Sequence, residues 1–291
     1  MGSTNDHNIL DVSESATKST FDPSIHLGRY RYYYDTTFSA AIDTLFIFGV
    51  ESSMEVEEYS DLAKTVVSGR PILFVTLDAQ SSDPVKFGDN VNELVHNLAL
   101  KFPDVQIDSN RKIIIGGHSA SGWAAISSFQ DLNFKPDAYI GLDPFPVNTV
   151  TMKIPYPALL WGFKKKPCGS DVDRAANAAF EISLKGKRVY YQIQNEHGKI
   201  AHSVFANDGC HPKVILGVEI PDYLYMGQWS ALNFDSFTCL QHDKEARSWL
   251  LEAVAKSVGL FALSLQDGEF SRERFLLAID GSNGEVDLHV D

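Results

Sequence analysis

The sequence has few cysteines, no N-glycosylation signal and no long apolar run. A chain of 291 residues has only three cysteines, namely Cys168, Cys210 and Cys239. This number is small and odd, so we do not expect a disulfide framework. We therefore expect a reducing compartment. The absence of any Asn-x-Ser/Thr sequence agrees with this expectation. No apolar run reaches the ~18 residues that a membrane-spanning helix needs, so we expect no integral membrane segment.

Positive charge is also scarce. The chain carries 25 Lys and Arg residues against 38 Asp and Glu residues, a formal net charge of −13. Such an acidic surface repels phosphate groups, which argues against nucleic acid and anionic membranes as partners. Neither G-x-G-x-x-G nor G-K-[ST] occurs, so we expect no cofactor. Residues 1–20 are polar and include acids, unlike a signal or transit peptide, and the expected location is cytoplasmic, or plastidic if a targeting segment precedes residue 1.

Apolar runs alternate with amphipathic stretches along most of the chain, and 44% of the residues are hydrophobic, enough for a large core. Strands are predicted at 28–35, 44–48, 71–77, 113–115, 138–142, 158–161 and 188–193. Helices are predicted at 61–67, 91–102, 122–129, 171–182 and 244–260, with Asp89 or Asn90 as the cap of the second. This alternation indicates an α/β protein with a mostly parallel central sheet and helices on both faces.

The same pattern predicts one domain with two flanking segments. Residues 1–25 are expected to form a flexible arm, residues 26–265 the domain, and residues 266–291 a C-terminal segment. Within the domain, residues 203–240 show little periodicity and many aromatic residues, which indicates a loop or cap over the edge of the sheet. The aromatic residues at 223–237 are expected either to pack in the core or to line an apolar pocket.

The strongest functional signal is the segment 113–122, in which an apolar strand runs into Gly-His-Ser-Ala-Ser-Gly and a helix of small residues. This strand, turn and helix is typical of a nucleophile elbow, with Ser119 as the nucleophile. The turn requires small residues two positions before and after the nucleophile, and Gly117 and Ser121 meet this need. The alternatives are a glycine-rich turn with a capping serine, or Ser121 as nucleophile, which would centre the turn on Ala120.

A nucleophilic serine needs a base, which in this fold follows the acid along the chain. We favour His202, because it lies in the loop after the predicted strand at 188–193. The alternative bases are His197 and His211. The other interpretation of these two histidines is that they have a surface role. His118 directly precedes the nucleophile, so it cannot act as the base and is expected to pack or hydrogen-bond beneath the turn.

The acid and the oxyanion donors are predicted from their positions. Asp143 ends the predicted strand at 138–142, while Asp171 and Asp173 follow the next strand, and position alone leaves the choice open. The expected oxyanion donors are the backbone N–H groups of Ala120 and Val50, the latter in the loop after the predicted strand at 44–48.

A zinc site is a further alternative for the same region. His197, His202, Asp208 and His211 lie within fifteen residues of one another, but their spacing differs from H-E-x-x-H. We therefore expect no metal in this protein.

Three stretches resemble the chlorophyllase and platelet-activating-factor acetylhydrolase-like branch of the α/β-hydrolase superfamily. They are GHSASG at 117–122, GLDPFP at 141–146 and AHSVF at 201–205. The likeness covers residues 40–260, and Pro-Cys-Gly at 167–169 is similar to chlorophyllases in particular. It implies an α/β-hydrolase fold.

The resemblance also implies a catalytic triad of Ser119, Asp143 and His202. The expected function is that of a serine esterase, which cleaves a hydrophobic carboxylic ester through an acyl-enzyme. Ala120 stands where chlorophyllases usually carry Arg, so the ester itself stays open. Alternatives are an acyltransferase, a lyase or a cyclase that uses the same site, or a binding protein without turnover.

Overall fold

The computed structural model describes residues 30–38, 40–51, 54–78, 82–145, 152–165, 175–194, 200, 202–206, 213–215, 218–220, 235–282 and 284–291. The predicted arm at 1–25 and most of the predicted cap at 203–240 lie outside these ranges. So do several residues that the sequence analysis considered for a site or a disulfide, namely Cys168, Asp171, Asp173, His197, Asp208, Cys210 and His211.

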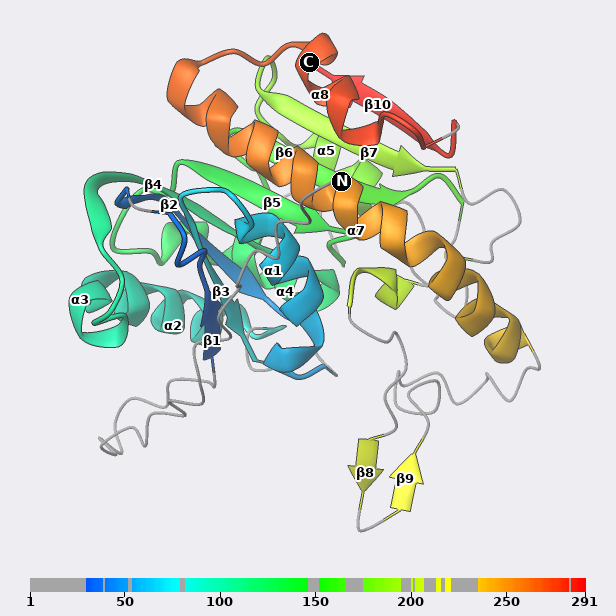
Figure 1. The fold of residues 1–291 in the computed structure, drawn as a ribbon, viewed down its shortest axis with the longest axis horizontal. Helices are drawn as coiled ribbons and strands as arrows, with labels where there is room; N and C mark the ends of the chain where they lie inside the picture. The colour runs from blue at the N-terminus through cyan, green and yellow to red at the C-terminus, as the bar shows by residue number, and fades with distance from the viewer. Residues whose placement is uncertain are drawn as a thin grey trace, which may run out of the picture.

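A mixed sheet of eight strands forms the centre of the described structure (Figure 1). Its strands, in spatial order, are β1 (Tyr30–Tyr33), β3 (Ile72–Leu77), β2 (Ile42–Gly49), β4 (Ile107–His118), β5 (Ala138–Leu142), β6 (Ala158–Phe163), β7 (Arg188–Ile193) and β10 (Val286–Val290). The edge strands β1 and β10 run antiparallel to their neighbours, and the six strands between them are parallel. The predicted α/β class and the mostly parallel sheet are therefore confirmed.

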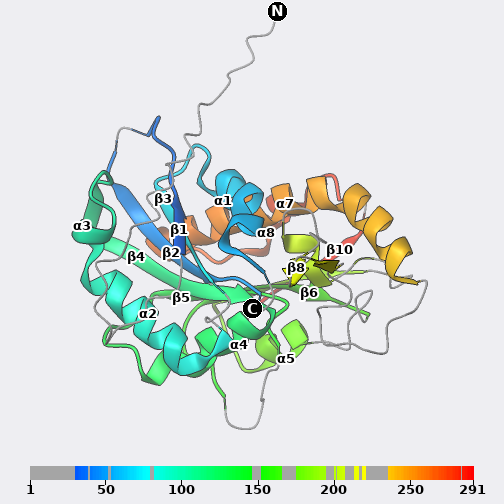
Figure 2. The same cartoon turned by 90° about the horizontal axis from the view of Figure 1, so that it is seen from below.

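Helices cover both faces of this sheet, as Figure 2 shows. One face carries α1 (Ser60–Val67), α7 (Asp235–Asp267) and α8 (Arg272–Leu276), and the other carries α2 (Pro84–His96), α4 (Ser119–Ser127) and α5 (Ala175–Glu181). A short helix, α3 (Leu98–Lys101), follows α2.

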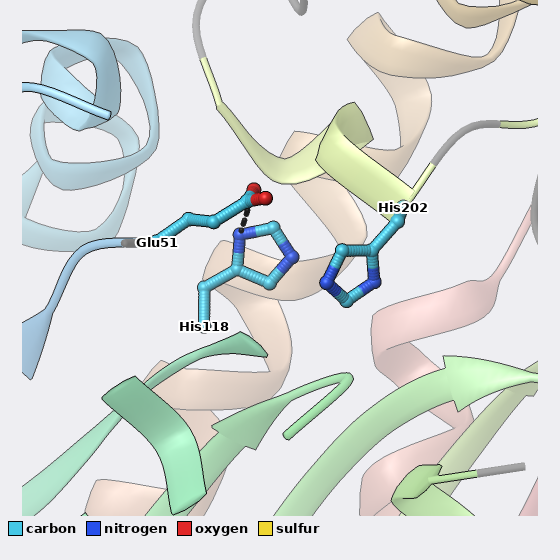
Figure 3. Close-up of side chains that lie close together, drawn as sticks. All are labelled: Glu51, His118 and His202. Atoms are coloured by element: carbon cyan, nitrogen blue, oxygen red, sulfur yellow. Dashed lines mark ion pairs between the residues drawn. The ribbon is translucent and has the colours of Figure 1, made fainter. Parts of the chain in front are cut away.

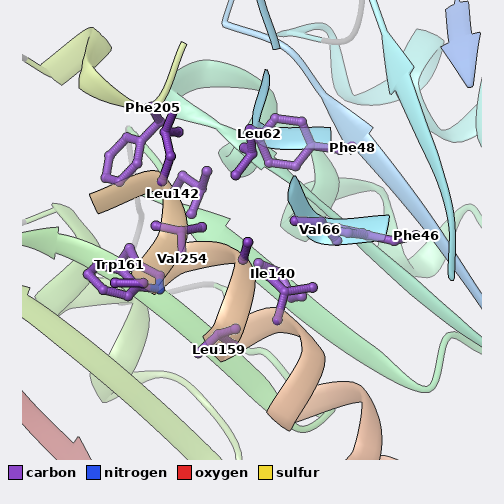
Figure 4. Packing of buried hydrophobic residues seen from close by; sticks show 14 of the residues in the cluster. Phe46, Phe48, Leu62, Val66, Ile140, Leu142, Leu159, Trp161, Phe205 and Val254 are labelled. Atoms are coloured by element: carbon purple, nitrogen blue, oxygen red, sulfur yellow. The ribbon is translucent and has the colours of Figure 1, made fainter. Parts of the chain in front are cut away.

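Each face has its own apolar core, because the inner strands are buried on both sides. All six residues of β3 and all six of β6 are buried. In the first core Leu62 of α1 and Val254 of α7 lie among sheet residues that include Phe48, Ile140 and Trp161 (Figure 4). The continuous apolar runs of the sequence thus predict these strands correctly.

Several boundaries differ from the prediction. Strand β4 begins at Ile107 rather than at residue 113, and α7 spans Asp235–Asp267 rather than 244–260. Helix α2 begins at Pro84 rather than at residue 91, because the Asp83 side chain accepts hydrogen bonds from the N–H groups of Val85 and Lys86 and so caps the helix seven residues earlier than the start we predicted. At the other end of the chain, β10 pairs with β7, so the sheet extends beyond residue 265, where the sequence analysis ended the domain. A separate antiparallel pair, β8 (Lys213–Ile215) and β9 (Val218–Ile220), lies within the predicted cap.

One helical stretch in the described part of the chain, Ser248–Asp267, is long and apolar enough by length and composition to cross a membrane. In the folded chain 56% of it is buried, and its apolar side chains pack in the core against the sheet. Its place in the core accounts for its apolar character.

The order of the strands sets where a site can form. From β2 the chain moves toward one edge of the sheet, to β3, and from β4 it moves toward the other edge, through β5 and β6. Open α/β sheets bind ligands at such a switch point, outside the carboxyl ends of the strands. Here the switch lies between β2 and β4, whose last paired residues are Gly49 and Gly117.

Candidate active site

The turn between β4 and α4 has strained backbone at Ser119. Strand β4 ends at His118 and α4 begins at the next residue, so no loop separates them. Ser119 has a φ of 54°, in the left-handed region that side chains other than glycine rarely adopt. Among the described residues only one other non-glycine residue has a positive φ, namely Asp143 at 42°. Strain of this kind collects at functional sites, and here it marks the predicted nucleophile and the predicted acid.

Close backbone contacts explain the small residues around this turn. A Cβ atom on Gly117 would lie 2.9 Å from both the carbonyl carbon of Ser121 and the amide nitrogen of Gly122. Gly122 is equally confined, because a Cβ atom there would lie 2.8 Å from the Cβ of Pro144. Ser121 is fully buried and its hydroxyl donates a short hydrogen bond to the carbonyl of Val50, which explains why serine is accepted where the pattern has glycine.

Asp143 and His202 form the central contact of the site. The Nδ1 atom of His202 lies 2.7 Å from Oδ2 of Asp143, and each side chain is only 2% exposed. Asp143 directly follows β5, and its backbone N–H donates to the carbonyl of Trp161 in the neighbouring strand β6. His202 opens a short 3₁₀ helix whose next apolar residues, Val204 and Phe205, are buried in the core. The carboxylate and the imidazole are therefore both held by well-packed elements.

This pairing controls the protonation of His202. Burial, the largest influence, disfavours the charged imidazole and lowers its pKa. The hydrogen bond that His202 donates to Asp143, the charge of Asp143 and the charge of Glu51 act in the opposite direction and together raise the pKa above its ordinary value of 6.5. A carboxylate on Nδ1 also fixes the tautomer, because Nδ1 keeps its proton and leaves the lone pair on Nε2.

The structure joins two of the three predicted catalytic residues by a hydrogen bond. Among the described residues, the buried Nε2 atom of His202 has no hydrogen-bond partner, so it is not bonded to the hydroxyl of Ser119. Ser119 itself is 8% exposed. Hydrogen bonds between a nucleophile and its base are often long in the absence of substrate and shorten when it binds.

The two predicted oxyanion donors differ in outcome. Ala120 lies in the first turn of α4, where an α-helix leaves its N–H groups without a partner in the helix, and its role stays a prediction. Val50 does not fit the predicted role, because its N–H donates to the carbonyl of Leu77 in β3 at 2.9 Å and is thus held within the sheet. The next N–H along the chain, that of Glu51, donates to the hydroxyl of Tyr59.

His118 lies beneath the turn, as predicted, and contacts two residues that the sequence analysis missed. Its Nδ1 atom lies 2.6 Å from the hydroxyl of Tyr59. The same atom lies 3.5 Å from Oε2 of Glu51, as Figure 3 shows. Burial, followed by the nearby charge of His202, holds the pKa of His118 well below its ordinary value, so the ring is neutral. The only sequence signal for Glu51 is its place at the carboxyl end of β2. Tyr59 gives none, since it comes from the 3₁₀ helix Val56–Tyr59.

Comparison with known proteins assigns no family to the chain. No family model matches it. No curated protein is significantly similar to it in sequence. Its function must therefore be inferred from the geometry described above.

Proposed function

We propose that this protein is a serine esterase with an α/β-hydrolase fold, in which Ser119, His202 and Asp143 cleave a hydrophobic carboxylic ester. The buried 2.7 Å contact between Asp143 and His202 carries the proposal. These residues lie far apart in the sequence, and among the described side chains they are paired in the orientation that an imidazole base requires.

The fold proposal is supported by where the strained serine lies. Ser119 follows β4, which lies inside the sheet with β2 on one side and β5 on the other. A serine on a sharp strand-to-helix turn, followed along the chain by an acid and then a histidine, is the arrangement of α/β-hydrolases. Ser119, Asp143 and His202 occur in that order. The resemblance of the three motif segments to chlorophyllases and platelet-activating-factor acetylhydrolases supports an ester as the substrate.

The proposed reaction has two steps. Nε2 of His202 takes the proton of the Ser119 hydroxyl while its oxygen attacks the ester carbonyl, and the N–H of Ala120 stabilises the oxyanion. The carboxylate of Asp143 stabilises the imidazolium that forms. The tetrahedral intermediate then expels the alcohol, which takes a proton from His202 and leaves an acyl group on Ser119. Water then gives a proton to Nε2 of His202 and attacks this acyl group. The bond from the acyl carbon to the Ser119 oxygen breaks, His202 returns the proton to that oxygen, and the acid product leaves.

The test is a panel of p-nitrophenyl esters of increasing acyl length, assayed with the wild-type chain and with Ser119→Ala. We expect hydrolysis by the wild type and a loss of several orders of magnitude in the variant. Ser127→Ala is the matched control, because Ser127 ends the same helix and its hydroxyl bonds only to the carbonyl of Trp123 among the described residues. Equal hydrolysis by Ser119→Ala and the wild type would contradict the proposal.

A further inference from the structure

Two buried imidazole nitrogens face each other beside the proposed triad. The rings of His118 and His202 have centroids 4.5 Å apart and are tilted by 41°. Figure 3 shows one ring nitrogen of each directed toward the other. In both residues Nε2 is buried and has no hydrogen-bond partner within the described ranges. Burying two such atoms without partners is costly, which points to a ligand that both can bind.

A carboxylate completes this group. Glu51, His118 and His202 each offer one ligand atom, and all three atoms lie within 4.8 Å of one another. All three side chains are buried. Bonds of about 2.0–2.2 Å place two ligands of a tetrahedral zinc ion roughly 3.4 Å apart, so ligand atoms that lie up to 4.8 Å apart need to approach one another by up to about 1.4 Å to hold an ion.

The far side of each ring is already held as metal-binding histidines require. A histidine that binds metal through one nitrogen usually hydrogen-bonds through the other, which fixes the tautomer and the ring orientation. Nδ1 of His202 pairs with Asp143 at 2.7 Å, and Nδ1 of His118 pairs with the hydroxyl of Tyr59 at 2.6 Å. Both Nε2 atoms are thereby presented to the same space.

We propose that Glu51, His118 and His202 form a site for a divalent metal ion of the zinc type, and that occupation of this site switches the esterase off. Two imidazoles and one carboxylate are a common zinc ligand set that leaves a fourth position for water. The zinc site considered and set aside from the sequence concerned other residues, with only His202 in common. The inhibitory role rests on the proposed function, because the ion takes the lone pair of His202 with which the base would accept the Ser119 proton.

Metal binding is measured first in the Ser119→Ala chain, which keeps all three ligands and lacks the nucleophile. The chelator-treated protein is titrated with ZnCl₂ in a calorimeter and with Co²⁺ by visible absorption. We expect one saturable site and the absorption of tetrahedral cobalt. Adding His118→Gln to this chain should weaken binding by more than the roughly 10–100-fold that loss of a residue behind a ligand costs. His96→Gln is the control, because His96 is exposed on α2, and it should leave binding unchanged.

Two further variants keep the test decisive if His118→Gln does not fold. Glu51→Gln removes another ligand, and Tyr59→Phe removes only the group that holds His118. We expect the first to abolish the rise in Tm that zinc causes and the second to weaken binding by about 10–100-fold. Saturable binding that is unchanged in every folded variant, or no saturable binding at all, would overturn the site.

The inhibitory role is measured in the wild-type chain by the rate at which a fluorophosphonate labels Ser119. We expect Zn²⁺ to slow labelling and a chelator to restore it. If zinc binds but the labelling rate does not change, the proposed inhibition is wrong and the proposed metal site stands. A chain that binds zinc but never labels or hydrolyses esters would overturn the proposed function, and the inhibition with it, but would keep the metal site.

Discussion

Replacement of Asp143 by Asn separates the charge of the proposed acid from its shape. Asn has nearly the same size and, like Asp, tolerates the left-handed backbone that this position adopts at a φ of 42°. What is lost is the carboxylate 2.7 Å from His202, in a site where both side chains are 2% exposed. Removing one partner of a buried charge pair costs about 3–5 kcal/mol, and about 1.4 kcal/mol is a factor of ten in rate. We therefore expect kcat/KM to fall by about 10²–10⁴-fold.

The same substitution should also change the pH profile. Asp143 opposes the effect of burial on His202 and raises its pKa above the ordinary value. In Asp143→Asn burial dominates, so the pKa of His202 falls and the neutral base persists at lower pH. The assay is the dependence of kcat/KM on pH between about 5 and 9. We expect its acidic limb to lie at lower pH in the variant than in the wild type.

Asp137→Asn is the matched control, because Asp137 directly precedes β5 and Asp143 directly follows it. Its carboxylate lies 3.1 Å from Nζ of Lys112 and accepts a hydrogen bond from the N–H of Ile113, and its side chain is 31% exposed. Because Asn keeps an oxygen that can accept from Ile113, loss of the charge should cost about 1 kcal/mol of stability or less. We expect no change in kcat/KM for this control. An Asp143→Asn protein that keeps more than about a tenth of kcat/KM, or an unshifted acidic limb, would refute the reasoning.

Three further predictions concern stability, each measured by urea denaturation. Gly117→Ala should cost about 1–3 kcal/mol, since the new Cβ would lie within 2.9 Å of three backbone atoms. Gly88→Ala should instead be neutral or gain up to about 1 kcal/mol, because Gly88 lies inside α2 and its new Cβ would make only ordinary contacts, with Ser128 at 3.4 Å and Asp131 at 3.8 Å. Ser257→Ala should cost about 1–3 kcal/mol, because it removes the acceptor 2.9 Å from the buried indole nitrogen of Trp161; an unchanged midpoint would contradict this. Because its pKa is raised on folding, protonated His202 stabilises the native state below pH ~6.5, and this contribution should fade as the pH rises through the raised pKa. A pH dependence that does not change when His202 is replaced by Gln would count against it.

The strands were predictable where burial alone defines them. The runs at 44–48 and 71–77 are apolar throughout because β2 and β3 are covered on both faces. The edge strand β10 gives a weaker signal, since it is short and Asp287 and His289 interrupt its apolar residues. The start of α2 was misplaced because the prediction took the apolar spacing from Val91, although Phe87 is buried on the same helix one turn earlier and the capping side chain of Asp83 sets the first turn.

The site was predictable where local backbone imposes a pattern. The strained turn at Ser119 requires small neighbours, and these make a recognisable motif. Position alone did not show that Asp143 contacts His202, because this contact depends on where β5 ends relative to the short helix that carries His202. The prediction that the N–H of Val50 is an oxyanion donor also missed a contact between distant residues. This N–H donates to the carbonyl of Leu77 in β3, and no local sequence pattern reveals that pairing.

The most direct test of the central claim is the reaction of the folded chain with a fluorophosphonate, with the adduct located by mass spectrometry. The proposed site predicts one adduct, on Ser119, that is absent from Ser119→Ala and retained in Ser127→Ala. An adduct on another residue, or esterase activity that persists in Ser119→Ala, would contradict the account.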